Sequence, residues 1–202
     1  MLVIGITGSF GSGKTTVARM FEKKGARLLN ADEMTRPLMR RNGECFQAVV
    51  RLFGQRILTD GRIDRKKLAR IVFNSPKGLK KLCNIIHPPV VRDIKKAIRK
   101  YQKNKAISAV VIDAPLLIEA GLHKYVDTLI VVKANRALQI KRIVERKGIC
   151  PADIKKRIRA QLSMREKIRC ADIMIDNRNR LAQTEKQVED IWLRLSKRKK
   201  RT

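Results

Sequence analysis

Long apolar segments are missing from this 202-residue sequence. Every apolar run is interrupted by charge, glycine or proline well short of the roughly 18 residues that a membrane-spanning helix needs. The first eight residues lack the basic start, long apolar stretch and cleavage site of a signal peptide. We therefore expect no transmembrane helix and no cleaved leader. We expect a cytoplasmic protein whose first residues form a β-strand.

Cysteine and aromatic residues are also scarce. The four cysteines, Cys45, Cys83, Cys150 and Cys170, are far apart and form no Cys-x-x-Cys pair. This spacing supports neither a zinc site nor a disulfide framework, so we expect buried free thiols in a reducing compartment. Aromatic residues make up 4% of the chain, which disfavours a stacking platform for single-stranded nucleic acid.

Acidic residues are few beside basic ones. The chain has 18 Asp and Glu against 48 Lys and Arg, a formal net charge of +30. A basic tail over residues 197–202 holds only five of the positive charges, so the excess is spread along the whole chain. Such a field attracts polyphosphates, but also RNA, DNA or anionic lipid. Charge alone therefore leaves a nucleic-acid-binding protein open as an alternative function.

Short apolar segments alternate with helical patterns along the chain. This order is typical of an α/β fold, a doubly wound parallel sheet of about five strands with helices on both faces. Predicted strands cover residues 2–7, 26–29, 109–113, 128–132 and 173–176. Predicted helices cover residues 14–24, a stretch from 136, the basic stretch 151–169, and 181–195. Residues 33–102 are mostly helical in pattern, with breaks expected at Asn42-Gly43, Asp60-Gly61, Ser75-Pro76 and His87-Pro88-Pro89.

The strongest motif lies directly after the first predicted strand. Residues 8–15 match G-x4-G-K-[ST] without a mismatch, and a helical pattern follows. Glycines in such a loop let successive backbone N–H groups turn toward an anion, and the helix that follows adds its positive end. Lys14 is expected to reach the β- and γ-phosphates of ATP, and the Thr15 hydroxyl to bind Mg2+. The predicted ATP-binding residues of this segment are Gly8, Gly11, Ser12, Gly13, Lys14, Thr15 and Thr16.

A phosphate-binding loop does not by itself name a reaction. The chain is short for a motor and has no Asn-Lys-x-Asp guanine motif, which disfavours a GTPase. A kinase needs a carboxylate near the acceptor hydroxyl and extra cations for the transferring group. Asp32, just after the second predicted strand, and Arg36, one helical turn on, are candidates for the acceptor side. Position alone equally allows an N-cap aspartate beside a solvated arginine.

Two further groups of residues have candidate roles. Asp113 ends a buried strand, the usual place for a carboxylate that holds metal-bound water, although a turn aspartate also fits. Arg142, Arg146 and Arg165 lie on predicted helices around a break at residues 148–151, the layout of a lid over ATP. In so basic a stretch any one arginine is also readily a solvated surface residue.

Taken in order, these motifs closely resemble the dephospho-CoA kinase family from about residue 2 to 195. The most specific elements are Asn30-Ala31-Asp32 with Arg36, His87-Pro88, and the Pro-Leu-Leu-x-Glu segment at residues 115–119. Further matching segments lie at residues 61–65, 141–142, 161–165 and 171–177. Asn30 departs from the family, which commonly has an aspartate there. A nucleoside monophosphate or shikimate-type kinase is the nearest alternative, and it would lack the His-Pro and Pro-Leu-Leu-x-Glu pair.

The resemblance implies an enzyme that phosphorylates the ribose 3′-hydroxyl of dephospho-CoA, with ATP as co-substrate and Mg2+ as cofactor. It implies Asp32 as the base, helped by Lys14 and Arg142, and Thr15 and Asp113 at the metal. It places Arg142, Arg146 and Asn177 at ATP. The implied acceptor-binding residues are Asp32, Arg36, His87, Leu116, Glu119 and Arg165.

The predicted organisation is one kinase domain over residues 1–196. It holds a helical acceptor-binding region at 33–105 and a lid at 136–169. The tail, residues 197–202, is expected to be disordered. A monomer or a small homo-oligomer is expected.

Overall fold

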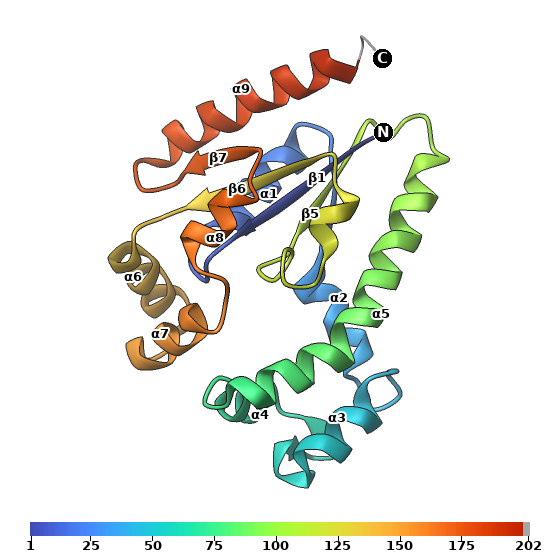
Figure 1. Ribbon diagram of the computed structural model, residues 1–202, viewed down its shortest axis with the longest axis vertical. Helices are drawn as coiled ribbons and strands as arrows, with labels where there is room; N and C mark the ends of the chain where they lie inside the picture. The colour runs from blue at the N-terminus through green and yellow to red at the C-terminus, as the bar shows by residue number, and fades with distance from the viewer. Residues whose placement is uncertain (200–202) are drawn as a thin grey trace. The chain divides into compact units, whose positions relative to one another are not determined.

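The computed structural model describes residues 1–199 (Figure 1). The chain divides into two compact units: Met1–Asn30 with Ala97–Thr202, and Ala31–Lys96. Helix α9 continues through Lys199, so the first residues of the expected disordered tail are helical and that prediction is wrong there. Residues 200–202 of the tail lie outside the described part.

The first unit is built on a five-stranded parallel sheet, which confirms the predicted fold class. Its strand order is β2-β5-β1-β6-β7. The strands are β1 (Leu2–Gly8), β2 (Arg27–Asn30), β5 (Ala109–Asp113), β6 (Thr128–Lys133) and β7 (Ile173–Asp176). Because all five run the same way, their carboxyl ends meet at one edge of the sheet. In this register Ile6 pairs with Asp113, and Asn30 pairs with Asp113 on the other side.

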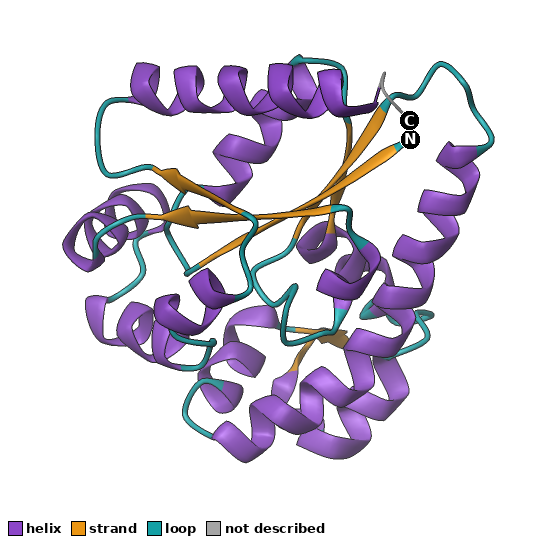
Figure 2. Ribbon diagram, turned by 45° about the horizontal axis from the view of Figure 1, so that its top comes forward, coloured by secondary structure: helices purple, strands orange, loops and turns teal. Residues whose placement is uncertain are grey.

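Helices cover the sheet. Because its central strands β1, β5 and β6 are buried on both faces, their sequences are continuous apolar runs. Helix α1 (Lys14–Lys23) packs against α9 (Leu181–Lys199), while α8 (Met164–Arg169) contacts β1 and β6 (Figure 2). The rings of Phe21 and Trp192 meet edge to face, with centroids 6.2 Å apart. Two more helices, α6 (Arg136–Lys147) and α7 (Pro151–Arg159), precede α8, and the 3-10 turn η2 (Leu122–Tyr125) contacts β1.

The second unit is mainly helical and carries one hairpin. It contains α2 (Ala31–Leu38), α3 (Phe46–Phe53), the turn η1 (Gln55–Ile57), α4 (Arg65–Val72) and most of α5 (Pro76–Gln102). Strands β3 (Leu58–Thr59) and β4 (Arg62–Ile63) pair antiparallel around Asp60-Gly61. The sequence pattern indicated only a break between helices here, since strands of two residues leave no periodicity to detect.

The course of helix α5 differs from the sequence-based prediction. It runs unbroken through His87-Pro88-Pro89, where a helix break was expected. A proline inside a helix removes one N–H donor and crowds the preceding turn. Here a buried stripe at every fourth position holds the helix against its neighbours and outweighs that cost. The stripe consists of Leu82, Ile86, Val90, Ile94 and Ile98.

The burial of the cysteines also differs in part from the prediction. All four are free, as predicted, and Cys45 is buried. Cys150 and Cys170 are exposed, so the prediction of buried thiols is wrong for these two. Both stand at the ends of short helices in the basic stretch, where no core covers them.

Candidate active site

The loop between β1 and α1 forms the centre of the site. Gly11 and Gly13 have φ angles of 84° and 89°, values that side-chain-bearing residues rarely adopt. Gly13 is the N-cap of α1, so the helix begins where the loop ends. Lys14 lies in the first turn with 8% of its surface exposed, and Thr15 and Thr16 follow it. The loop has the backbone freedom and the helix N-terminus that a phosphate-binding site requires.

Asn177 holds this loop from the side. Its amide nitrogen donates to the Ser12 carbonyl oxygen at 2.8 Å, and its amide oxygen accepts from the Thr184 hydroxyl at 3.0 Å. A Cβ atom added to Gly13 would lie 2.1 Å from the Asn177 nitrogen, so only glycine fits there. Asn177 is 4% exposed and follows β7 directly. Its hydrogen bond to Ser12 therefore acts on the backbone of the loop, a role that the sequence did not reveal.

Three polar side chains converge at the carboxyl edge of the sheet. The Thr15 hydroxyl donates to Asp113 Oδ2 at 2.6 Å, and Asn30 Nδ2 lies 3.3 Å from the same oxygen. Asp113 is 2% exposed, at the end of β5. The parallel register explains the meeting, because Asn30 and Asp113 are paired strand ends. Hydroxyl and carboxylate oxygens are ligands that Mg2+ accepts.

Arg142 reaches the loop from α6. The position that a Cβ would take on Gly13 is 3.7 Å from Arg142 Nη1. That nitrogen is buried and has no hydrogen-bond partner among the described residues. Burial lowers the pKa of the Arg142 guanidinium from its ordinary value, and repulsion by Arg146 lowers it further. A guanidinium group with a buried, unpartnered nitrogen beside a phosphate-binding loop is suited to binding an anion.

The other predicted lid arginines are exposed. Arg146 lies on α6 and Arg165 on α8. The lid segment is nevertheless tied to the loop by two contacts that the sequence did not indicate. The Phe10 N–H donates to the Gln161 side-chain oxygen at 3.0 Å, and the Arg157 guanidinium stacks over the Phe10 ring at 5.3 Å from its centroid.

Glu119 and a buried lysine brace the turn after β5. Lys167 Nζ donates to the Pro115 carbonyl oxygen at 2.7 Å and to Glu119 Oε1 at 3.0 Å. The Leu162 N–H donates to the same Glu119 oxygen at 3.0 Å. Burial lowers the pKa of the Lys167 ammonium, and the Glu119 carboxylate opposes that shift. Leu116, half-buried, belongs to the turn that these bonds hold.

The remaining acceptor-side candidates belong to the second unit. Asp32 and Arg36 are exposed and stand one turn apart on α2, where the Thr35 hydroxyl donates to the Asp32 carbonyl oxygen at 2.8 Å. His87 is half-buried within α5. Their roles in binding and proton transfer stay predictions.

The described residues contain neither a cluster of metal-binding side chains nor a membrane-spanning helix. Within residues 1–199, no cluster of three or more His, Cys, Asp or Glu side chains is placed to hold a metal ion. Mg2+ commonly binds through one or two protein ligands together with substrate phosphates, so the expectation that Thr15 and Asp113 bind it does not require such a cluster. In the same part of the chain, no helix is long and apolar enough to cross a membrane.

Comparison with known proteins gives one consistent family. A family model described as dephospho-CoA kinase matches residues 2–183. A dephospho-CoA kinase from Geobacter metallireducens is 42% identical over 193 residues, which cover 95% of this chain and 96% of that protein. One from Symbiobacterium thermophilum is 40% identical over 193 residues, which cover 95% of this chain and 80% of that protein.

Solved structures agree with this result. TT1252 from Thermus thermophilus has a TM-score of 0.76 and 30% identity, covering 96% of this chain and 97% of that one. Dephospho-CoA kinase from Campylobacter jejuni has a TM-score of 0.67 and 27% identity over the same shares. Shikimate kinase from Acinetobacter baumannii, at 18% identity and a TM-score of 0.55, covers 98% of this chain and 94% of that one, and shows a shared fold only.

Proposed function

Because this chain belongs to the dephospho-CoA kinase family, we propose that it transfers the γ-phosphoryl group of ATP to the ribose 3′-hydroxyl of dephospho-CoA. The products are coenzyme A and ADP, and this is the last step of coenzyme A biosynthesis. The observation that carries the proposal is the contact between Thr15 and Asp113 beside the glycine loop. It provides metal ligands next to a phosphate-binding backbone, as phosphoryl transfer requires.

Mg2+ is the proposed cofactor, held by Thr15 and Asp113. The fit rests on their chemistry, because both side chains offer oxygen atoms as metal ligands, and Thr15 Oγ1 lies 2.6 Å from Asp113 Oδ2. Mg2+ held by Thr15 and Asp113 would supply positive charge to offset the negative charge that develops on the phosphate oxygens during transfer. Asn30, which reaches the same carboxylate oxygen, orients Asp113 without adding a negative charge.

The ATP side consists of the loop and the lid. Gly8, Gly11, Ser12, Gly13 and Thr16 surround the phosphates through backbone and hydroxyl groups, and Lys14 contacts the β- and γ-phosphates. Arg142, Arg146 and Arg165 supply positive charge over the transferring group. Support for Arg142 comes from its buried, unpartnered nitrogen near Gly13. Asn177 keeps the loop in place on the adenine side.

The acceptor side supplies the base and the orientation. Asp32 takes the proton of the 3′-hydroxyl, and the hydroxyl oxygen bonds to the γ-phosphorus. The bond between the γ-phosphorus and the oxygen that joins it to the β-phosphate breaks, and ADP leaves. Arg36 and His87 bind the charged part of the acceptor. Glu119, through its bonds to Lys167 and Leu162, fixes the turn that presents Leu116.

The protein is proposed to work in the cytoplasm as a monomer or small homo-oligomer. Four free cysteines, two of them exposed, are compatible with a reducing compartment.

The test is a coupled ADP-release assay with dephospho-CoA, run beside AMP, shikimate and pantetheine phosphate. We expect Mg2+-dependent turnover with dephospho-CoA alone, with coenzyme A as product. Asp32→Asn should lower kcat about 100- to 10,000-fold, the usual contribution of a general base. Asp60→Asn, a matched change at an exposed turn where Asn is well tolerated, should leave kcat unchanged. Turnover with another acceptor instead of dephospho-CoA would overturn the proposal.

A further inference from the structure

The connection between helices α7 and α8 is short, and both of its residues make hydrogen bonds to distant parts of the candidate site. Only Gln161 and Leu162 lie between the C-cap of α7 and the N-cap of α8. The Phe10 N–H donates to the Gln161 side-chain oxygen at 3.0 Å, and the Leu162 N–H donates to Glu119 Oε1 at 3.0 Å. The connection is therefore fixed to the phosphate-binding loop at one residue and to the turn after β5 at the next.

The first half of the loop, Phe10 and Gly11, lies against the helices of the proposed lid. A Cβ atom added to Gly11 would lie 2.9 Å from the Gln139 carbonyl oxygen, so the loop backbone packs directly on α6. One residue earlier, Phe10 is bonded to Gln161, and the Arg157 guanidinium of α7 lies 5.3 Å from the centroid of its ring. These two loop residues therefore form the contact between the loop and both helices.

The second half of the loop is held from elsewhere. Asn177, after β7, donates to the Ser12 carbonyl oxygen at 2.8 Å. Within the loop, the Ser12 N–H donates to the Ser9 carbonyl oxygen at 3.1 Å. Neither bond involves Gln161, so removing the Gln161 side chain leaves both in place. The two halves can therefore be perturbed separately: Ser12 belongs to the support of the ATP-binding backbone, and Phe10 belongs to the contact with the lid helices.

The bond between Phe10 and Gln161 joins segments that lie 151 residues apart in the sequence. Catalysis of phosphoryl transfer is almost entirely positioning and electrostatic stabilisation of the transferring group. A displacement of about 1 Å in such a site can lower the rate by about 100-fold. A bond that fixes the lid helices against the loop therefore bears on the rate of transfer more than on the affinity for ATP.

We propose that Gln161 is a positioning residue for phosphoryl transfer. By accepting the Phe10 N–H, it fixes the proposed lid against the loop, so that the lid arginines lie over the γ-phosphate in the transition state. The inference rests on the proposed kinase function, and Gln161 acts through Phe10 rather than through contact with a substrate.

Gln161→Met tests the proposal, because it removes the acceptor oxygen with little change in side-chain length. We expect kcat at saturating ATP and dephospho-CoA to fall about tenfold, the effect of one lost hydrogen bond. The Kd for a non-hydrolysable ATP analogue with Mg2+, measured by isothermal titration calorimetry, should change less than about twofold. Retained binding also verifies that the variant is folded. An unchanged kcat, or equal losses in kcat and in analogue affinity, overturns the proposal.

Gln161→Glu is the conservative variant, because a carboxylate oxygen can accept the same N–H. Its kcat should lie within about threefold of wild type. Saturating ATP keeps any weaker binding caused by the added negative charge out of this value. A kcat no higher than that of Gln161→Met would contradict a role through the bond to Phe10.

Hydrogen exchange of the Phe10 amide, followed by NMR, reports on the bond without any turnover. Exchange should be slow in wild type and Gln161→Glu and faster in Gln161→Met. Equal exchange in the three proteins overturns the proposal. The kinase function fails separately: absence of turnover with dephospho-CoA in wild type rejects that function, whereas turnover with the same kcat in every variant rejects only the role of Gln161.

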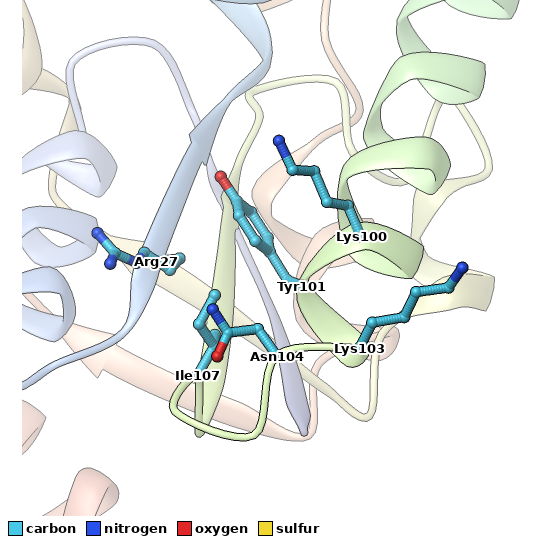
Figure 3. Close-up of a pocket in the computed structure, with 6 residues that line it drawn as sticks. All are labelled: Arg27, Lys100, Tyr101, Lys103, Asn104 and Ile107. Atoms are coloured by element: carbon cyan, nitrogen blue, oxygen red, sulfur yellow. The ribbon is translucent and has the colours of Figure 1, made fainter.

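Gln102→Met makes the same chemical change at an exposed position. Gln102 lies between Tyr101 and Lys103, which line a hollow of about 340 Å³ where β2 and β5 begin, at the end of the sheet opposite the loop (Figure 3). The charged ends of Arg27, Lys100 and Lys103 point away from one another there, so the change disturbs no common anion site. We expect kcat and analogue affinity within about twofold of wild type. A tenfold fall in kcat here as well would defeat the proposal.

Discussion

The side chain of Lys167 is completely buried, and its ammonium group lies 3.0 Å from the carboxylate of Glu119. The two partners are not equally buried, because 19% of the Glu119 side chain remains exposed. A carboxylate with access to water can be hydrated when its partner is lost, whereas an ammonium group without access cannot. The ion pair is therefore asymmetric, and this asymmetry can be measured.

Glu119→Gln should destabilise the protein more than Lys167→Met does. The first change leaves an ammonium group buried without a counter-charge, which costs about 3 kcal/mol of unfolding free energy. The second leaves a partly exposed carboxylate that keeps its bond from the Leu162 N–H, and we expect a loss of at most about 1–2 kcal/mol. Urea unfolding monitored by circular dichroism gives both values. Glu44→Gln, which breaks an exposed pair with Arg92, is the control and should cause no resolvable change. The reverse order of the two losses would contradict this account.

Asn177→Ala should weaken ATP binding through the loop, whether or not the Asn177 side chain contacts ATP. The change removes the hydrogen bond to the Ser12 carbonyl oxygen, which holds the loop, and leaves that buried group unpaired. We expect the Kd for ATP to rise about tenfold, equivalent to about 1.4 kcal/mol, measured by isothermal titration calorimetry. Thr184→Val removes only the outer bond, from the Thr184 hydroxyl to the Asn177 oxygen, and should have a smaller effect in the same direction. An unchanged Kd in Asn177→Ala would mean that the loop keeps its shape unaided.

The strands and the phosphate loop could be predicted from the sequence because their signals are local. β5 and β7 begin and end at the predicted residues, since each is a short apolar run bounded by polar residues. The helical pattern of α5 was predicted, but its continuity through two prolines could not be, because the buried stripe that outweighs them forms only in the folded state. Lys167 was missed for a similar reason: its burial depends on residues about 50 positions away, and nothing distinguishes it among 48 basic residues. The roles of Asp32, Arg36 and His87 stay predictions.

Asp176 should make stability depend on pH below about 4. Hydrogen bonds from Arg178 lower the pKa of the Asp176 carboxyl below its ordinary value. The folded state therefore favours the charged form, and the resulting stability is present above the unfolded pKa of about 3.9 and is lost as pH falls through the folded value. Both side chains are partly exposed, so the contribution should be under about 1 kcal/mol.

The measurement compares wild type with Asp176→Asn by urea unfolding between about pH 2.5 and 6. The difference in unfolding free energy between the two proteins should be constant near the upper end of this pH range. It should shrink as the pH falls toward the lower end. Other carboxyls with lowered pKa values, such as Asp64 and Glu166, are present in both proteins and cancel. A difference that does not vary with pH would rule out this linkage.

Asn30→Asp should make the stability of the protein depend on Mg2+. Asn30 now donates to the Asp113 oxygen that also accepts from Thr15. An aspartate in its place removes a donor and sets a second carboxylate beside Asp113, so without metal we expect a loss of about 1–3 kcal/mol. Mg2+ should reverse much of that loss, because a divalent cation offsets the paired negative charges. Asn30→Ala removes the donor without adding charge, and should respond to Mg2+ no more than wild type does. Thermal unfolding of the three proteins across a Mg2+ titration tests this directly, and equal Mg2+ responses in Asn30→Asp and Asn30→Ala would remove Asp113 from the proposed metal site.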